Sequence, residues 1–166
     1  MVIISALGLD IGKKRIGVAG CDGTGLIATG LTTISRTSRF FGPSAARSRC
    51  AHAAQSQVVA SLRELVVERQ VQVLVIGLPY TMKGSLGYQA RLVQKEARSL
   101  GAALQLPVEY VDERLTSMEA EQLLIDQKLS PSRHKELIDR KAACLILQRW
   151  LDSQATDRLP VLPGIS

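Results

Sequence analysis

The feature that most constrains the fold is an apolar run, Val71–Leu78, which is interrupted only by Gln72 and ends at Gly77 and Pro79. It has the length of one β-strand, and it lacks the alternation of apolar and polar residues that a strand with one solvated face shows. Strands that are buried on both faces read in this way, and they lie in sheets that helices cover on both sides. The run therefore predicts an α/β protein.

Three other strands are expected before this run, over residues 3–11, 15–21 and 26–34. A short turn at Lys13-Lys14 joins the first two, and Asp22-Gly23-Thr24-Gly25 is a strong turn signal between the second and the third. Strands that are joined by such short turns pair in antiparallel fashion. The amino-terminal part of the chain is therefore predicted to be an antiparallel meander.

Helices and strands alternate after the meander. Apolar residues recur at helical spacing from about residue 51 to 69 and over 88–105, a short strand is expected over 108–111, and further helices over 116–128 and 133–151. This order predicts a mixed five-stranded sheet, three antiparallel strands then parallel strands, flanked by helices. One domain is expected over residues 1–152, with a basic loop or arm at about 35–50 and a loosely ordered tail at 153–166.

The charge of the chain is positive and unevenly distributed. The net charge is +6; residues 1–83 contain 10 lysines and arginines against 4 acids, whereas residues 84–166 contain 11 of each. No carboxylate lies between Asp22 and Glu64, a stretch that holds five arginines. This bias indicates a polyanionic partner, nucleic acid first, although a solubilising surface would also explain it.

Several classes of protein are disfavoured by the composition. No apolar run is long enough to cross a membrane, and the three widely spaced cysteines form no metal-ligand pattern. We therefore expect reduced thiols, a cytoplasmic location and no membrane partner. Aromatic residues make up 4% of the chain, which argues against a platform on which single-stranded bases stack.

Asp10 lies inside the first predicted strand, in the sequence Leu7-Gly8-Leu9-Asp10-Ile11-Gly12. Alternation along a strand places Gly8, Asp10 and Gly12 on the same face. The carboxylate therefore has no side chain beside it along that face, which leaves room for a metal ion or a phosphate. A strand-end aspartate between two turn glycines is the plain structural alternative.

Two other acidic positions are expected to lie near Asp10. Asp112 and Glu113 follow the last predicted strand. Asp139 heads a stripe of the last helix that should pack against the sheet, formed by Ala142, Ala143, Ile146 and Trp150. A carboxylate on a packed helix face is costly unless a cation or a hydrogen-bond donor pairs with it.

Simpler roles for these acids remain open. Asp139 can be a helix-start residue or a partner of Arg140 or Lys135, and Asp112-Glu113-Arg114 can be a local salt-bridged turn. Sites in a doubly covered sheet nevertheless collect at the carboxyl ends of parallel strands, where these acids would meet. Converging carboxylates repel one another unless a divalent cation neutralises them. Two Mg²⁺ ions held there would activate water and stabilise the leaving oxygen of a phosphodiester.

Four motifs resemble those of the YqgF/RuvX-type nucleases of the RNase H-like superfamily, over roughly residues 6–151. They are Gly8–Gly12 with Arg15–Ala19, Val75–Pro79 with Met82–Ser85, Asp112–Ser117, and Lys135, Asp139, Ala142-Ala143 with Ile146–Gln148. Any one of them alone is weak, but the four in this order are specific. The resemblance implies an RNase H-like fold and a nuclease that depends on Mg²⁺ or Mn²⁺. It also implies that Asp10, Glu113 and Asp139 are the catalytic and metal-binding acids, with Asp112 as the alternate second acid.

The resemblance further implies hydrolysis of phosphodiester bonds at the 5′ end of pre-16S ribosomal RNA during ribosome biogenesis, with Holliday-junction resolution as the alternative. The expected partner is pre-rRNA, or branched DNA in the second case, and the chain is expected to act as a monomer or a homodimer. Basic residues near the acids and in the arm are expected to contact phosphates, with a solvated surface as the alternative. They are Lys13, Lys14, Arg15, Lys83, Arg114, Arg36, Arg39, Arg47 and Arg49.

Two further classes compete with the nuclease. An RNase H-like module that binds RNA or a protein without turnover is the more serious one, and the presence of all three acids argues against it. An actin-like ATPase also opens on an Asp-x-Gly hairpin, but it needs two such domains to clamp a nucleotide. A chain of 166 residues is long enough for only one.

Overall fold

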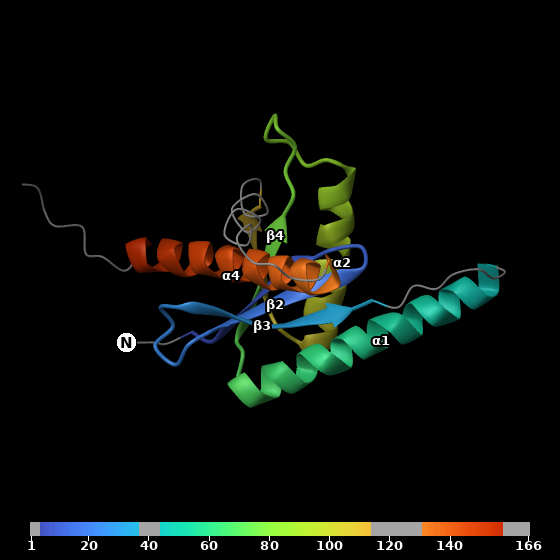
Figure 1. Cartoon of the computed structure of the whole chain (residues 1–166), viewed down its shortest axis with the longest axis horizontal. Coiled ribbons are helices and arrows are strands. Elements are labelled where there is room, and N and C mark those ends of the chain that lie inside the picture. The colour runs from blue at the N-terminus through green and yellow to red at the C-terminus, as the bar shows by residue number, and fades with distance from the viewer. Residues whose placement is uncertain (1–3, 37–43, 114–130, 158–166) are drawn as a thin grey trace, which may run out of the picture.

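The computed structural model describes residues 4–36, 44–113 and 131–157. A five-stranded sheet lies at its centre in the order β3-β2-β1-β4-β5 (Figure 1). The strands are β1 Ala6–Ile11, β2 Arg15–Cys21, β3 Ala28–Ser35, β4 Val73–Leu78 and β5 Val108–Asp112. β1, β2 and β3 pair in antiparallel fashion, whereas β4 is parallel to both β1 and β5. The predicted mixed sheet is confirmed.

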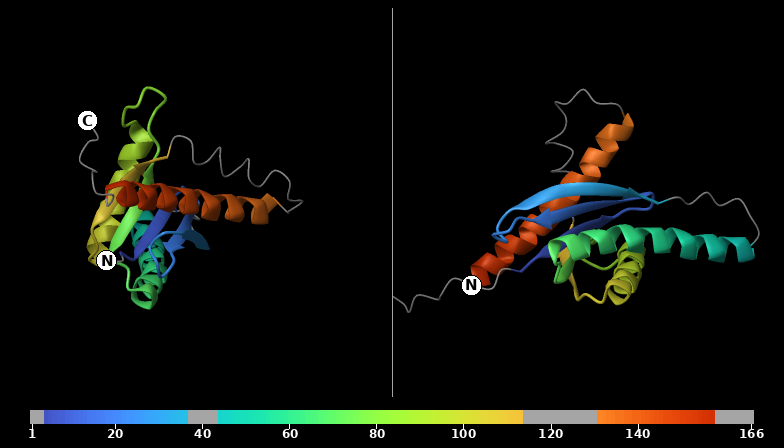
Figure 2. Two further views of the ribbon diagram at one scale, coloured as in Figure 1. Left: turned by 90° about the vertical axis from the view of Figure 1, so that its left-hand side faces the viewer. Right: turned by 90° about the horizontal axis from the view of Figure 1, so that it is seen from below.

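Helices cover both faces of this sheet. They are α1 Ser44–Arg69, α2 Tyr88–Leu104 and α4 Pro131–Asp157. Figure 2 shows α1 and α2 on one face of the sheet and α4 on the other. Leu9 and Ile76 pack with Leu62 of α1 and Leu100 of α2, and Val75 packs on the face that α4 covers. The uninterrupted apolar character of β4 follows, because every one of its residues is buried. None of the helices in the described part of the chain is long and apolar enough to cross a membrane.

Glycines on the sheet allow α4 to cross it at close range. A Cβ atom on Gly8 would lie 2.6 Å from Cβ of Leu147, and one on Gly77 would lie 2.5 Å from Cδ1 of Ile146. A Cβ atom on Gly17 would collide with the carbonyl oxygen of Asp139. The absence of side chains at these glycines lets the helix pack directly against the backbone of the sheet, and such close packing fixes its position.

Two segments differ from the expectation. α1 begins at Ser44, so residues 44–50 of the predicted basic arm are helical and not a loop. The basic, polar composition suggested a loop, but neither glycine nor proline occurs from residue 44 to 69, and the alanines there are strong helix formers. α4 runs to Asp157, so residues 153–157 of the predicted tail are also helical, since the first proline after them is Pro160.

The third strand begins two residues later than expected, because the turn before it is longer. The carboxylate of Asp22 accepts hydrogen bonds from the backbone nitrogens of Leu26 and Ile27, both at 3.1 Å, and Asp22 N donates to the oxygen of Ile27 at 2.9 Å. Leu26 and Ile27 therefore belong to the turn and are exposed. The helix that was expected over 116–128 lies outside the described residues.

Candidate active site

Asp10 lies on the central strand between two glycines of the neighbouring strands. Its antiparallel partner on β2 is Gly17. On β4, Ile76 pairs with Leu9, so the next residue of β4, Gly77, lies beside Asp10. Because Leu9 packs towards α1 and α2, alternation directs Asp10 to the face that α4 covers. Neither neighbouring strand therefore places a side chain beside the Asp10 carboxylate. The backbone of Asp139 lies over Gly17, and the side chains of Ile146 and Glu113 lie over Gly77.

Glu113 is the acid that meets Asp10. The two carboxyl groups are joined by a side-chain hydrogen bond. Glu113 N donates to the carbonyl oxygen of Leu78 at 3.0 Å, which extends the pairing of β5 with β4 by one residue. Oε2 of Glu113 lies 3.0 Å from the position that a Cβ atom of Gly77 would occupy. The missing side chain of Gly77 thus makes room for the Glu113 carboxylate.

Alternation along β5 explains why this acid is Glu113 and not Asp112. Oε2 of Glu109 accepts a hydrogen bond from Nε1 of Trp150 on α4 at 2.5 Å, and Val111 packs against the same helix. Glu109, Val111 and Glu113 therefore share the α4 face, and Asp112 belongs to the opposite one. The carbonyl oxygen of Asp112 accepts a hydrogen bond from Nη1 of Arg149 at 3.2 Å.

Asp139 reaches the same region from α4, where Arg15 at the start of β2 holds its carboxylate. Nε of Arg15 lies 2.6 Å from Oδ2 of Asp139, and the two side chains are 27% and 24% exposed. The collision that a Gly17 side chain would cause places the Asp139 backbone directly above β2. Sequence considerations offered neighbours within α4 as partners of Asp139, whereas the partner in the structure is 124 residues away.

Burial and like charges raise the pKa of Asp10 well above its usual range. Burial is the largest cause, the charge and the hydrogen bond of Glu113 follow, and the charge of Asp139 adds to them. A hydrogen bond between two carboxyl groups requires a proton on one of them. Without a cation, the folded protein therefore holds a proton on Asp10 more tightly than an isolated carboxyl does.

The donor chemistry of these acids fits a hard divalent cation, although the three are not gathered into one ligand set. Carboxylate oxygens are the ligands that Mg²⁺ and Mn²⁺ take in proteins. Among the described residues, no group of three or more His, Cys, Asp or Glu side chains is arranged to hold a metal ion. Asp10 and Glu113 fit as a pair, whereas Oδ2 of Asp139 is engaged by Arg15.

The basic residues expected to contact phosphates fall into three groups. Lys13, Lys14 and Lys83 are exposed, and Arg15 is engaged with Asp139. Nη1 of Arg36 donates to the carbonyl oxygen of Gly12 at 2.7 Å, and its Nη2 forms an ion pair with Glu96 of α2. Arg39 and Arg114 lie outside the described residues, as do the side chains of Arg47 and Arg49 on α1.

Sequence reasoning did not find the internal roles of Arg15 and Arg36. Arg36 is half-buried and holds the β1–β2 turn, because its backbone N also donates to the oxygen of Lys14 at 2.8 Å. For Arg36 the sequence did contain a signal. Glu96 is the only acid between residues 79 and 108, and it lies on a helix whose other charged residues are cations. A lone acid in such a place is a reason to look for an internal arginine partner.

The sheet order, with an acid on the central strand and a helix crossing beside it, is that of RNase H-like proteins. RuvC from T. thermophilus, solved in complex with a Holliday junction substrate, has this fold: the TM-score is 0.56, with 12% identity, 92% of this chain and 96% of that chain covered. The structure of RuvC alone gives a TM-score of 0.52 with 13% identity. At these identities the likeness concerns the fold alone.

Sequence relationships define the family. The chain matches the model of the RuvX family, described as Holliday junction resolvase, over residues 4–51 and 41–153, and it belongs to this family. A protein of Trichormus variabilis named "Putative pre-16S rRNA nuclease" is 61% identical over 154 residues, which cover 93% of this chain and 91% of that protein. One from Acaryochloris marina with the same name is 56% identical, covering 91% and 94%.

Proposed function

We propose that this protein is a nuclease that hydrolyses phosphodiester bonds and processes the 5′ end of pre-16S ribosomal RNA in the cytoplasm. The observation that carries the proposal is the meeting of Asp10, on the central strand β1, with Glu113, at the end of the edge strand β5, and Asp139 is close enough to raise the pKa of Asp10. The choice of substrate is supported by the names of relatives that are 61% identical to this chain.

The residues of this chain would have separable tasks in that reaction. Asp10 and Glu113 would hold Mg²⁺ or Mn²⁺, and Asp139 would complete the set once it is released from Arg15. The bound cation would supply an activated water and neutralise charge on the leaving oxygen. The pair of carboxyls must give up its proton to hold the cation, which links binding of the metal to pH. In this hydrolysis a water oxygen would bond to phosphorus, the bridging P–O bond would break, and the leaving oxygen would take up a proton.

The cations around the acids would position the substrate. Lys13 and Lys14 on the β1–β2 turn and Lys83 on the β4–α2 loop are exposed, so their ammonium groups are available to phosphates. Arg36 would act indirectly, since it holds the turn that carries Lys13 and Lys14. Arg39, Arg47, Arg49 and Arg114 are proposed as further phosphate contacts on the ground of their charge alone.

Resolution of Holliday junctions is a second candidate, favoured by the description of the family to which the chain belongs. A four-way junction has two-fold symmetry, so a resolvase is expected to act as a homodimer, whereas processing of one RNA end needs only a monomer. Solution mass measured with and without substrate therefore helps to separate the two candidates.

A cleavage assay with three substrates tests the proposal. Wild-type protein and Asp10→Asn are compared on a 5′-extended 16S precursor RNA, a four-way DNA junction and an unstructured RNA, with Mg²⁺, Mn²⁺ or EDTA. We expect wild-type protein to shorten the precursor with either metal and Asp10→Asn to be inactive. Cleavage of the junction alone would support the resolvase, and binding without cleavage by any metal would support the non-catalytic module. Unchanged cleavage by Asp10→Asn would rule out the proposed site.

A further inference from the structure

We propose that a braced loop and the first turns of α2 form a binding surface for unpaired nucleotides beside the candidate active site. This surface consists of residues 81–85, between β4 and α2, and of the exposed side of α2 from Tyr88 to Lys95; it is called the finger surface below. The inference rests on the proposed function, because it names the form of nucleic acid that the site receives.

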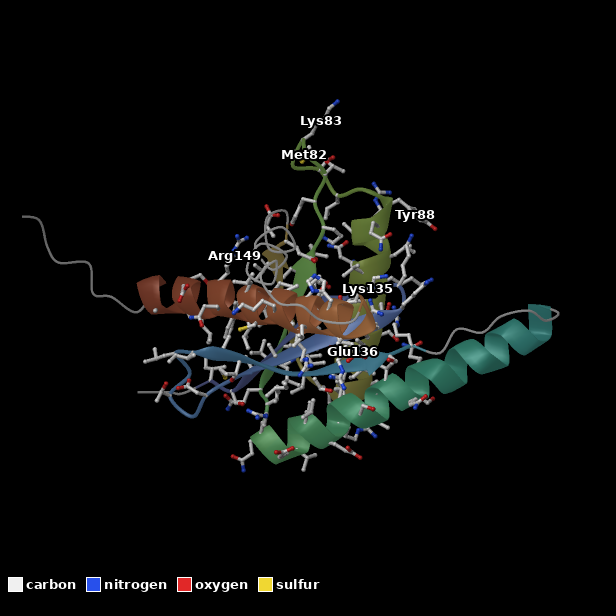
Figure 3. The ribbon with its side chains drawn as sticks, viewed as in Figure 1. Met82, Lys83, Tyr88, Lys135, Glu136 and Arg149 are labelled. Carbon is white, nitrogen blue, oxygen red and sulfur yellow. The ribbon has the colours of Figure 1, made fainter. Side chains whose placement is uncertain are left out.

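The finger surface begins at the edge of the sheet where the acids meet. The carbonyl oxygen of Leu78, the last residue of β4, accepts hydrogen bonds from Glu113 N and from Tyr80 N, both at 3.0 Å. The loop therefore leaves the sheet from the same backbone that positions Glu113. Figure 3 shows Met82 and Lys83 at its projecting tip and Tyr88 at the start of α2. A strand bound to this surface would lead towards the acids.

The loop is held in shape by its own hydrogen bonds. Thr81 N donates to the oxygen of Ser85 at 3.0 Å, Gly84 N donates to the oxygen of Thr81 at 2.8 Å, and the hydroxyls of Thr81 and Ser85 lie 2.7 Å apart. Gly84 has a φ of 77°, which glycine adopts without strain. A braced loop loses little conformational freedom when it binds, which makes it suitable for recognition.

Apolar side chains are unusually exposed on this surface. Met82 is 95% exposed, Tyr88 78% and Leu92 43%, and Leu86, between the loop and α2, is 38% exposed. Burial cannot explain them, because α2 packs on the sheet through its other side, which holds Ala90, Val93, Ala97 and Leu100. An aromatic ring and a thioether pack well against the faces of bases, and these faces are accessible only where nucleotides are unpaired.

The charge of the finger surface fits a polyanion. The surface holds three cations, Lys83, Arg91 and Lys95, and no acid, and the next residue, Glu96, is paired with Arg36. Tyr88, Arg91, Leu92 and Lys95 recur at the spacing of a single helix face, and all four are exposed. One face of α2 therefore presents both a ring that can contact a base, Tyr88, and cations that can contact phosphates, Arg91 and Lys95. An acidic peptide would satisfy the cations alone, whereas a single-stranded nucleic acid uses both kinds of side chain.

Binding to a pair of RNA hairpins tests the inference. One hairpin carries a single-stranded extension and the other is blunt, and affinity is measured by fluorescence anisotropy in EDTA so that cleavage does not contribute. The double variant Met82→Ala/Tyr88→Ala is expected to bind the extended hairpin roughly tenfold more weakly, since stacking on one base contributes about that much. Its affinity for the blunt hairpin should change less than about twofold.

Matched variants keep the test specific. Tyr88→Phe retains the ring and should bind like wild type, and so should Val67→Ala, which shortens a 72% exposed side chain on α1. Arg91→Gln with Lys95→Gln should lower the slope of log affinity against log salt by about 1.4 for a single strand. Arg63→Gln, on α1, should leave that slope unchanged.

If the double variant lost equal affinity for both hairpins, or lost none for either, the finger surface would not be a site for unpaired nucleotides. Its failure is distinguishable from failure of the proposed function. Specific loss on the extended hairpin by a protein that cleaves no nucleic acid would keep the finger surface and reject the nuclease. Metal-dependent cleavage by a double variant that binds both hairpins like wild type would keep the nuclease and reject the finger surface.

Discussion

The guanidinium of Arg15 and the carboxylate of Asp139 are joined at 2.6 Å, between β2 and α4, at the place where the third acid would have to turn towards a metal ion. Arg15 thereby compensates the charge of Asp139 in the absence of a cation. Because one carboxylate cannot serve both partners fully, the ion pair and the metal are expected to compete for Asp139. This competition can be measured without any nucleic acid.

Removal of the arginine is therefore predicted to strengthen binding of the metal. Arg15→Gln should lower the Kd for Mn²⁺ by up to about fivefold, because a partly exposed ion pair contributes at most ~1 kcal/mol. Isothermal titration calorimetry or Mn²⁺ electron paramagnetic resonance gives the Kd. Lys14→Gln removes the same charge from an exposed neighbour that has no such pair. If both variants changed the Kd for Mn²⁺ equally, the cause would be the general loss of positive charge near the acids and not the ion pair with Asp139.

The stability of the metal-free protein should depend on pH through Asp10. The pKa of Asp10 is raised in the folded state, first by burial and then by Glu113 and Asp139, so the folded state binds this proton more tightly than the unfolded state does. The contribution of Asp10 to stability is therefore lost as pH rises from the ordinary carboxyl pKa towards the raised one. Asp10→Asn should remove this decline and unfold at a higher Tm at pH 7. Thermal unfolding in EDTA across this pH range measures it.

Asp22 offers the opposite control. Its pKa is lowered, mainly by the hydroxyl of Thr24, so its contribution to stability is present above the ordinary carboxyl pKa and is lost as pH falls. Asp22→Asn should therefore leave the decline with rising pH in place. If the stability of Asp10→Asn still declined with rising pH, another titrating group would be responsible for the decline.

The close crossing of α4 over β2 should make Gly17 sensitive to a single methyl group. A Cβ atom there would collide with the backbone of Asp139. Gly17→Ala is expected to destabilise the protein by about 1–3 kcal/mol, as overpacking does, and to reduce cleavage because Asp139 moves. Denaturant unfolding provides the free energy. Gly23→Ala is the control, since a Cβ atom at Gly23 meets open space, and an equal loss in both variants would contradict the explanation.

The arginines of the amino-terminal half should differ in what their removal changes: stability for Arg36, and RNA binding for Arg39, Arg47 and Arg49. Arg36→Gln removes the bond to Gly12 and the ion pair with Glu96, so we expect a loss of about 1–2 kcal/mol in stability and an unchanged salt dependence of RNA affinity. Neutralising Arg39, Arg47 and Arg49 together should reduce the salt slope by about 2 units while stability is retained. An unaltered slope in the triple variant would show that this segment does not contact phosphate.

Much of the fold follows from local pattern. The apolar run at Val73–Leu78, the turn at Asp22 and the spacing of apolar residues in α2 are each sufficient to place an element, because strand and helix periodicities are properties of short segments. The ends of elements follow less directly from composition: the basic residues before 51 suggest a loop, but α1 begins at Ser44 since nothing after Pro43 interrupts a helix. Sequence also singled out Asp10, as a charge inside a strand stands out without any tertiary context.

Partners of the acids were decided by the tertiary structure. Which of Asp112 and Glu113 turns towards Asp10 depends on the register and the direction of β5, and these are fixed only by its pairing with β4. Arg15 and Asp139 lie 124 residues apart and meet because Gly17 lets α4 approach. Composition argued against contact with unpaired bases since aromatics are few, but a count does not say which residues are exposed. A single tyrosine at the start of α2 is left on the surface because the helix buries its other side, and that side was determined by packing against the sheet.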